Sequence, residues 1–367
     1  MRELLLDRVI ETYKRGGIRL LAAKVVHRMR LTENKRKLYI QTDLANFCNL
    51  RCRMCYFYTG GPEVKVRLSF QEFCKRFDPF ADRIFSFGLS CATEPLVVRE
   101  EELFKVFRWI GDCRIPDSFM VTNAMLLRPK IAEAFIDAHL SRLVVSLDSH
   151  IREEYEAIRL GAKFDTVVEN VRYFCSYRKS KPFYFPRLQI NCVLMRRNIE
   201  EIGPFVRFIH KLGADDVDFR HVVPYSGLDI DKESLVHYKE LCNKHLRIAR
   251  SKCNELGIRI VNIPGEFNLD SVSGAPQSPT KRACHIPSTF MYVRPDGNIQ
   301  PCTLWFGQET MGNLANNDFE TVWNEPRYRR FREEVAAGIL TRHCCQTCPS
   351  LGGGSIDNEG SFGEKSP

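Results

Sequence analysis

The sequence lacks any uninterrupted apolar run of about 20 residues, the length that a helix needs to cross a bilayer. It also lacks a short charged-then-apolar leader of the kind that directs secretion. These two absences predict a cytoplasmic protein in a reducing compartment, where clustered cysteines are better interpreted as metal ligands than as disulfide partners. No internal repeat of fixed period is present, and 367 residues suffice for one large domain and a small one.

Little net charge is found outside the first 37 residues. Residues 1–37 hold eleven basic and four acidic side chains, a net charge of +7 out of a total of +9, so the rest of the chain does not indicate a nucleic-acid-binding surface. Apolar positions recur at intervals of three and four, which predicts two amphipathic helices over 4–14 and 18–29. Residues 1–30 either contact an anionic surface such as a membrane or cap the next domain, with their basic face in solvent.

Three of the fifteen cysteines lie within eight residues of one another. Cys48, Cys52 and Cys55 follow the apolar run at 38–44, so they share one loop after a predicted strand. Three thiolates are too few for a closed structural zinc site, which takes four ligands. They suffice for a [4Fe–4S] cluster with one iron left open. Three unrelated buried cysteines, or a zinc site with a remote fourth ligand, are the alternatives.

From residue 38 onwards, strand-like runs alternate with helical stretches. The strand-like runs are 38–44, 84–89, 118–122, 143–147, 188–194 and 217–223. The helical stretches between and after them are 69–77, 100–113, 130–138, 164–176, 202–212 and 234–256. This alternation predicts repeated βα units and a parallel sheet. In parallel α/β barrels the chemistry lies at the carboxyl ends of the strands, where the three-cysteine loop is expected.

The C-x3-C-x2-C spacing of Cys48, Cys52 and Cys55 resembles the signature of the radical S-adenosylmethionine (SAM) enzymes. The resemblance implies an α/β fold, a partial (β/α)6 barrel over residues 38–267. It also implies a [4Fe–4S] cluster that binds SAM and an electron donor of the flavodoxin or ferredoxin type. In that family the reduced cluster cleaves SAM to a 5′-deoxyadenosyl radical, which abstracts a hydrogen atom from the substrate.

Further stretches resemble the SAM-binding motifs of that family, in the expected order. Ala92-Thr93-Glu94-Pro95 resembles the Gly-Gly-Glu-Pro motif, whose glutamate accepts hydrogen bonds from the SAM ammonium. Ser146-Leu147-Asp148 occupies the place of the ribose-binding motif, and strand alternation puts Ser146 and Asp148 on one face. Arg159 is the candidate partner of the SAM carboxylate. The residues that the resemblance assigns to SAM are Tyr56, Glu94, Asn123, Ser146, Asp148, Arg159 and Asn191.

Structural roles stay open for several of these residues. A glutamate before proline is common in the first turn of a helix, and an aspartate in the place of Asp148 can cap the helix that follows. Asn191, between apolar neighbours, can bridge backbone groups instead of binding SAM. Alternation turns Cys192 toward the outer helices. It also turns Arg220 and His221 to opposite faces, and one of those two is expected to meet the substrate.

A second set of cysteines lies near the carboxyl terminus. Cys284 and Cys302 flank a predicted hairpin turn at 295–298, and Cys345 and Cys348 form a C-x2-C pair. Four thiolates can close around one cluster or around the zinc of a ribbon. Their spacing resembles the SPASM extension of radical SAM enzymes, in the one-cluster form called Twitch, since no cysteine follows Cys348. That resemblance implies an auxiliary [4Fe–4S] cluster. Cys344 adjoins the pair, and the spacing favours Cys345 as the ligand.

The predicted organisation follows from these motifs and from composition. Its parts are basic helices at 1–37, the barrel at 38–267, a polar linker at 268–281, the auxiliary domain at 282–350 and a flexible tail at 351–367. The auxiliary domain is predicted to contain a hairpin and one helix near 319–331.

The resemblance predicts an oxidoreductase or an epimerase. Family members with this layout act on carbohydrate-like small molecules, and a fully ligated auxiliary cluster can accept an electron from a substrate radical. An epimerase also returns a hydrogen atom, for which Cys91, after the second strand, is the candidate donor.

The alternatives are a peptide maturase, an RNA-modifying enzyme and a non-catalytic scaffold. Relatives that modify peptides usually carry a leader-binding domain, and 37 residues ahead of the barrel are too few for one. An RNA-modifying enzyme would use the basic arm on phosphates. A non-catalytic iron–sulfur or zinc scaffold would hold metal without cleaving SAM.

Overall fold

The computed structural model describes residues 36–58, 62–182, 185–223, 228–269, 283–305, 309–346 and 348. The predicted N-terminal helices, nearly all of the predicted linker and the predicted tail lie outside these residues. So does the side chain of Tyr56. Among the described residues, no helix combines the length and the apolar character needed to cross a membrane.

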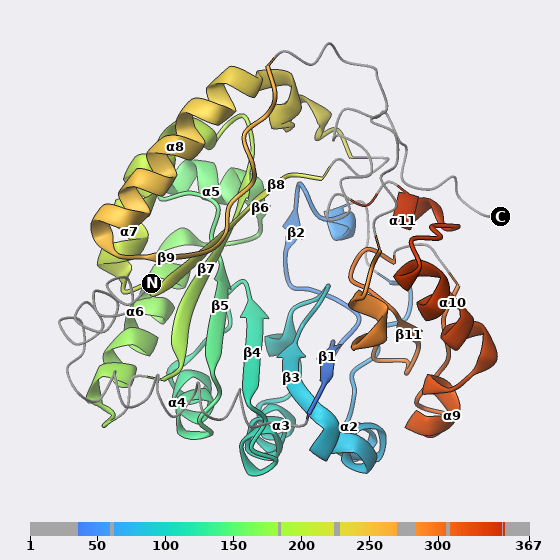
Figure 1. Ribbon diagram of the computed structural model, residues 1–367. Coiled ribbons are helices and arrows are strands. Elements are labelled where there is room, and N and C mark those ends of the chain that lie inside the picture. The colour runs from blue at the N-terminus through green and yellow to red at the C-terminus, as the bar shows by residue number, and fades with distance from the viewer. Residues whose placement is uncertain are drawn as a thin grey trace, which may run out of the picture.

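A nine-stranded sheet forms the centre of the molecule, in the order β11-β10-β1-β3-β4-β5-β7-β8-β9 (Figure 1). The seven strands from β1 to β9 in that order pair in parallel. They are β1 (Leu38–Thr42), β3 (Ile84–Leu89), β4 (Asp117–Thr122), β5 (Arg142–Ser146), β7 (Arg187–Leu194), β8 (Asp216–His221) and β9 (Arg259–Asn262). The six predicted strands are therefore present. The seventh, β9, was not predicted, because it is short and largely exposed.

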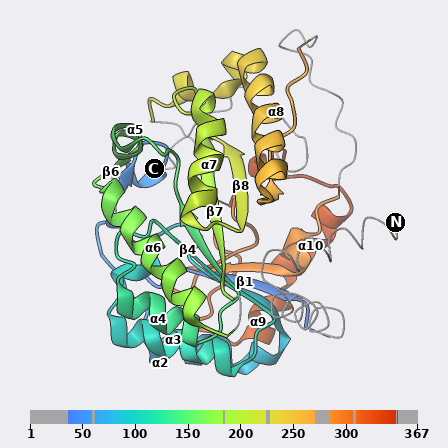
Figure 2. The ribbon, with the colours of Figure 1, turned by 90° about the vertical axis from the view of Figure 1, so that its left-hand side faces the viewer.

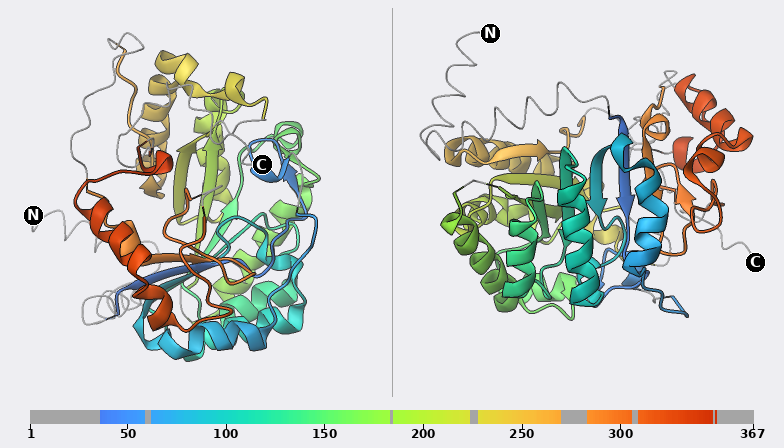
Figure 3. Two further views of the ribbon diagram at one scale, coloured as in Figure 1. Left: turned by 90° about the vertical axis from the view of Figure 1, so that its right-hand side faces the viewer. Right: turned by 90° about the horizontal axis from the view of Figure 1, so that it is seen from below.

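Six helices cover the convex face of this sheet, as Figures 2 and 3 show. They are α2 (Phe70–Phe77), α3 (Glu100–Asp112), α4 (Pro129–Asp137), α6 (Phe164–Ser180), α7 (Ile202–Leu212) and α8 (Lys239–Leu256). The strands from β1 to β8 bury apolar side chains beneath them. In β8, for example, Val217 and Phe219 are fully buried, whereas Asp216, Asp218 and Arg220 alternate with them on the concave face.

Smaller elements sit at the carboxyl ends of the strands. β2 (Arg51–Cys52) pairs antiparallel with β6 (Arg159–Leu160), which follows α5 (Arg152–Ile158). This pairing was not predicted, since each of the two strands has only two residues. It fixes the three-cysteine loop against a segment more than 100 positions further along the chain.

The hairpin of the predicted auxiliary domain extends the barrel sheet. β10 (Phe290–Val293) pairs in parallel with β1, and β11 (Ile299–Gln300) pairs antiparallel with β10. Beyond the hairpin lie α9 (Phe319–Trp323), α10 (Pro326–Ala336) and α11 (His343–Gln346). The prediction of a single helix near 319–331 was wrong: Pro326 has no N–H to continue α9, and it begins α10 instead.

Candidate active site

The three-cysteine loop lies at the carboxyl end of β1. Cys52 is buried, Cys48 and Cys55 are half-buried, and all three thiols are free. Burial raises the pKa of Cys48 to about 12 and that of Cys55 to about 11. At neutral pH such thiols stay protonated unless a metal centre replaces the proton. The site therefore offers three sulfur ligands in a poorly hydrated place, which fits a [4Fe–4S] cluster.

Among the described residues, no three Cys, His, Asp or Glu side chains are grouped closely enough to hold a single metal ion. A [4Fe–4S] cluster does not need such a group, because each thiolate binds a different iron.

A buried ion pair stands beside the loop. Arg159 donates from Nε to Asp148 Oδ2 over 2.7 Å, and its Nη1 lies 3.7 Å from the sulfur of Cys52. The backbone N–H of Val193 donates to the other oxygen, Asp148 Oδ1, over 2.9 Å. Both carboxylate oxygens of Asp148 are thus engaged, which favours a role in positioning Arg159 over direct contact with a ribose. Burial raises the pKa of the Cys52 thiol, and the guanidinium of Arg159 opposes that rise, so Arg159 favours the thiolate that a cluster requires.

Glu94, the candidate SAM ligand in the motif after β3, is almost fully buried. Its carboxylate accepts hydrogen bonds from Thr122 Oγ1 at 2.7 Å, the N–H of Asn123 at 2.8 Å and the N–H of Leu96 at 3.1 Å. Burial raises the pKa of Glu94 to about 7, against the opposing effect of these donors. The first-turn alternative also holds in part, because Glu94 caps a short 3-10 helix that begins at Pro95.

Asn123 connects the end of β4 to the three-cysteine loop. Its Nδ2 donates to Asn49 Oδ1 over 2.9 Å and lies 3.8 Å from the sulfur of Cys48. Its Oδ1 accepts the N–H of Met125 at 3.0 Å. Both polar atoms of the Asn123 side chain thus have partners within the protein. A role in holding the three-cysteine loop is therefore an alternative to the predicted contact with SAM.

A row of polar side chains crosses the concave face of the sheet. Ser146 of β5 is in register with Asn191 of β7, and Asn191 is in register with Asp218 of β8. Asp218 accepts a hydrogen bond from Asn262 of β9 at 3.3 Å. Asn191 itself accepts one from Gln189 at 2.8 Å, so its side chain faces the concave side and bonds a neighbouring side chain rather than backbone.

The two consecutive residues at the end of β8 have separate environments. Arg220 shares the concave face with Asp218, to which it donates over 2.8 Å, and its side chain is 68% exposed. His221 turns away and stacks on Phe267, with ring centroids 5.1 Å apart. Burial lowers the pKa of His221 to about 4, so its ring is neutral. Arg220 is therefore the one of the two that is open to a ligand on the concave face. Cys192 is buried in the core, as predicted.

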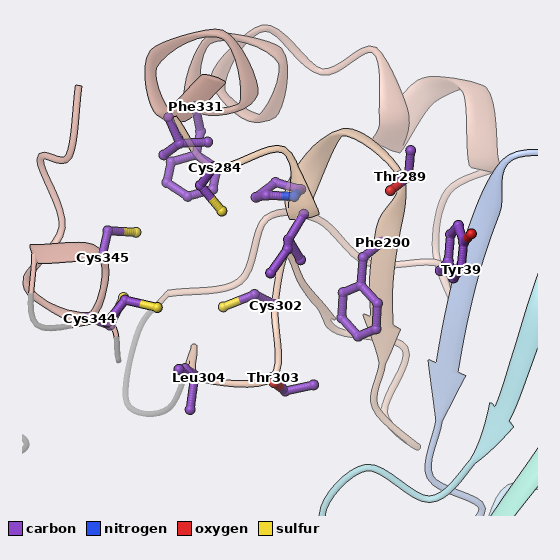
Figure 4. Close-up of a pocket in the computed structure, with 14 residues that line it drawn as sticks. Tyr39, Cys284, Thr289, Phe290, Cys302, Thr303, Leu304, Phe331, Cys344 and Cys345 are labelled. Carbon is purple, nitrogen blue, oxygen red and sulfur yellow. The ribbon is translucent and has the colours of Figure 1, made fainter. Parts of the chain in front are cut away.

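The second cysteine set lines a cavity of about 340 Å³ beside β10. Figure 4 shows the sulfur atoms of Cys284, Cys302, Cys344 and Cys345 directed into the same space. The cysteines that line the cavity are Cys284, Cys302, Cys344, Cys345 and Cys348. The remaining wall is mainly apolar, with Phe290, Leu304 and Phe331 among its members.

Burial raises the pKa of the Cys302 thiol to about 12, so an ion or cluster has to supply the charge that keeps it deprotonated. Five thiols in a dry pocket fit an iron–sulfur cluster, and they leave one thiol more than a four-ligand cluster needs.

One pair of residues beside the site was not predicted. Asp43, directly after β1, accepts hydrogen bonds from the backbone of the Cys91–Thr93 segment and from the hydroxyl of Tyr292. Asp43 carries a sequence signal, a carboxylate at the end of an apolar strand. Its partner lies 249 positions away and carries none.

Two family models match the chain. The model of the radical SAM superfamily covers residues 43–209, and that of SPASM, an iron–sulfur cluster-binding domain, covers residues 284–349. Two similar proteins are an AdoMet-dependent heme synthase of Methanosarcina barkeri and a GTP 3′,8-cyclase of Listeria monocytogenes. The first is 25% identical over 320 residues, 80% of this chain and 84% of the synthase. The second is 27% identical over 296 residues, 73% of this chain and 79% of the cyclase.

Among solved structures, SuiB of Streptococcus suis bound to S-adenosylmethionine matches with a TM-score of 0.64 at 16% identity, over 90% of this chain and 78% of SuiB. SuiB bound to its precursor peptide SuiA matches with a TM-score of 0.63 at 17% identity, over 88% of this chain and 74% of SuiB. At these identities the likeness concerns the fold.

Proposed function

Because this chain belongs to the radical SAM superfamily and carries an iron–sulfur cluster-binding SPASM domain, we propose that it abstracts a hydrogen atom from a carbohydrate-like small molecule. The proposed net reaction is oxidation by dehydrogenation or epimerisation at a carbon atom. The two domains imply SAM and both the SAM-binding and the auxiliary [4Fe–4S] clusters as cofactors. The SAM-binding cluster and its bound SAM supply, on reduction, the 5′-deoxyadenosyl radical that abstracts the hydrogen atom.

The residues of the chain divide this work. In the proposal, Cys48, Cys52 and Cys55 hold the SAM-binding cluster. Glu94 accepts hydrogen bonds from the SAM ammonium, and Arg159 provides a fixed positive charge next to Cys52. The auxiliary set Cys284, Cys302, Cys345 and Cys348 holds the second cluster, an electron acceptor when bound.

The polar row on the concave face supports a hydroxylated substrate. Ser146 and Asn191, which the proposal assigns to SAM, are half-buried in this row. Beside them, Asn262 of β9 is exposed and Arg220 of β8 is open to a substrate that lies next to SAM. The hydroxyl groups of a substrate can form the hydrogen bonds that these side chains otherwise form with solvent. An apolar substrate would bury these polar side chains without offering them a hydrogen bond, at a cost of about 1–3 kcal/mol for each donor or acceptor left unsatisfied.

Cys91 is the proposed hydrogen donor if the reaction is an epimerisation. It follows β3, and burial raises the pKa of its thiol well above the ordinary value, with the nearby acids Asp43 and Cys302 adding to the shift. The thiol therefore keeps its hydrogen at neutral pH. A hydrogen-atom donor needs that S–H bond.

The isotopic outcome in deuterated water separates the two reactions. Epimerisation is expected to give a product of unchanged composition that carries one solvent deuterium, because the thiol exchanges its hydrogen with solvent. Dehydrogenation is expected to give a product lighter by two hydrogens and without such deuterium. The measurement is mass spectrometry of the product from candidate hydroxylated substrates, with 5′-deoxyadenosine quantified in parallel.

Cys91→Ala is expected to stop epimerisation while 5′-deoxyadenosine still forms, and Cys74→Ala, a half-buried cysteine of the outer helix α2, is the matched control. If no hydroxylated compound raises 5′-deoxyadenosine release, the proposed substrate class is wrong.

A peptide is the second candidate substrate. SuiB, whose fold matches most of this chain, was solved with its precursor peptide SuiA bound. Release of 5′-deoxyadenosine that rises with short peptides, and not with hydroxylated small molecules, would select this candidate.

The affinity for SAM is expected to depend on pH through Glu94. The pKa of about 7 in the free protein means that the carboxyl group is largely protonated below pH 7 and no longer accepts the SAM ammonium. A bound ammonium lowers that pKa, so the affinity rises with pH up to about 7 and then levels off. Equilibrium dialysis of the reconstituted protein should show binding about tenfold weaker at pH 6 than at pH 8. Glu94→Gln should bind weakly at both pH values, and a wild-type profile as flat as that of the variant would contradict the assignment.

A further inference from the structure

Asp43 is a fully buried carboxylate with several donors from distant parts of the chain. Its Oδ1 accepts hydrogen bonds from three consecutive backbone N–H groups, those of Cys91 at 2.8 Å, Ala92 at 3.3 Å and Thr93 at 3.4 Å. Its Oδ2 accepts the hydroxyl of Tyr292. The carboxylate therefore closes the turn that joins β3 to Glu94.

Hydrogen bonds also connect this turn to the three-cysteine loop. Glu94, at its end, accepts the N–H of Asn123 at 2.8 Å. Asn123 in turn donates to Asn49 over 2.9 Å, next to Cys48. A shift of the turn at 91–93 would move Glu94 and, through Asn123, the wall of the SAM-binding site.

Tyr292 belongs to the other module. It lies on β10, which pairs in parallel with β1, and its register partner on β1 is Gln41. Two positions earlier on the same strand, Phe290 lines the cavity that contains the second cysteine set. Thr42 adds a second buried link, because its Oγ1 donates to the carbonyl of Val293 over 2.9 Å.

From this geometry we propose that Asp43 and Tyr292 are positioning residues that tie the SAM-binding turn at 91–94 to the auxiliary module. The turn has no ladder of its own, since residues 90–94 form no strand or helix. Hydrogen bonds to a carboxylate are about twice as strong as neutral ones, so Asp43 holds the turn in place of a ladder. The phenol of Tyr292 satisfies the oxygen that would otherwise be buried without a partner. This inference concerns SAM binding and does not depend on the class of substrate.

The variants Tyr292→Phe and Asp43→Asn test it by two readouts. The first is hydrogen–deuterium exchange of the peptide that contains the amides of Cys91, Ala92 and Thr93. The second is the dissociation constant of SAM, measured on reconstituted protein whose iron and sulfide contents equal those of the wild type. Tyr292→Phe is expected to speed exchange at 91–93 and to weaken SAM binding about five- to tenfold. This is less than the full effect of losing one hydrogen bond to a charged group, because Tyr292 acts on SAM only through the turn.

Tyr328→Phe is the matched control. Tyr328 is also fully buried in the auxiliary module, on α10, and its hydroxyl contacts the carbonyl of Phe290 at 3.5 Å rather than Asp43. This variant should change neither readout. Asp43→Asn keeps the size of the side chain but removes its charge, so it should speed exchange at 91–93 even if Tyr292→Phe lowers the yield of folded protein.

Normal exchange at 91–93 and normal SAM affinity in Tyr292→Phe would overturn the proposal, as would an equal effect of Tyr328→Phe. Neither readout uses product formation, so a wrong substrate class leaves the outcome of this experiment unaffected.

Discussion

Replacement of Cys48, Cys52 and Cys55 together by alanine is expected to abolish formation of 5′-deoxyadenosine. The three free thiols lie together at the carboxyl end of β1, and in the proposed function they are the ligands without which no cluster is held there. Iron should fall by about four atoms per chain, the content of one [4Fe–4S] cluster. The reduced variant should also lose the low-temperature electron paramagnetic resonance signal that changes on addition of SAM.

The control for this variant is a triple replacement of cysteines that lie on outer helices. Cys74 of α2, Cys175 of α6 and Cys253 of α8 are free thiols that belong to neither cysteine set. Their replacement by alanine should leave iron content and SAM cleavage unchanged in folded protein. Intact turnover in the variant that lacks Cys48, Cys52 and Cys55 would remove the basis for assigning radical chemistry to this chain.

Replacement of Cys284 and Cys302 by alanine is expected to separate SAM cleavage from product formation. These residues contribute two of the five thiols in the cavity beside β10, so their loss leaves only thiols from the segment 344–348, on one side of a four-ligand cluster. Iron should fall from about eight to about four atoms per chain while the signal of the SAM-binding cluster remains. Slow release of 5′-deoxyadenosine should persist, whereas an oxidised product should no longer form, because its electron has no acceptor.

Single variants in the same cavity identify the third ligand. Cys344 and Cys345 both line the cavity, and the C-x2-C spacing predicts that Cys345 binds the cluster. Cys345→Ala should therefore lose auxiliary iron, and Cys344→Ala should retain it. The reverse result would assign the ligand to Cys344. Full retention of iron in the Cys284 and Cys302 double variant would contradict an auxiliary cluster at this position.

Features that depend on short spacings in the chain were predictable from the sequence. The motif of Cys48, Cys52 and Cys55 lies on one loop, so its spacing alone indicates which kind of metal centre the three cysteines can bind. The six strands and their helices were predictable as well, because periodicity reports which face of an element is buried. The break between α9 and α10 is also local, but the apolar pattern across 319–331 outweighed the signal of Pro326.

Contacts between strands that are distant in sequence decided the rest. The position of Arg159 beside Cys52 depends on a two-residue ladder between β2 and β6, which is too short to leave a periodic signal. The choice of Arg220 over His221 for the concave face required the position of Phe267.

The amino-acid sequence by itself determined the chemistry of this protein, because the ligand sets are local and cysteine spacing restricts what they can bind. Only the tertiary structure decided how the two modules meet. The hydrogen bond between Asp43 and Tyr292 arises from the parallel register of β1 with β10, and a register between strands some 250 positions apart depends on the packing of the whole chain.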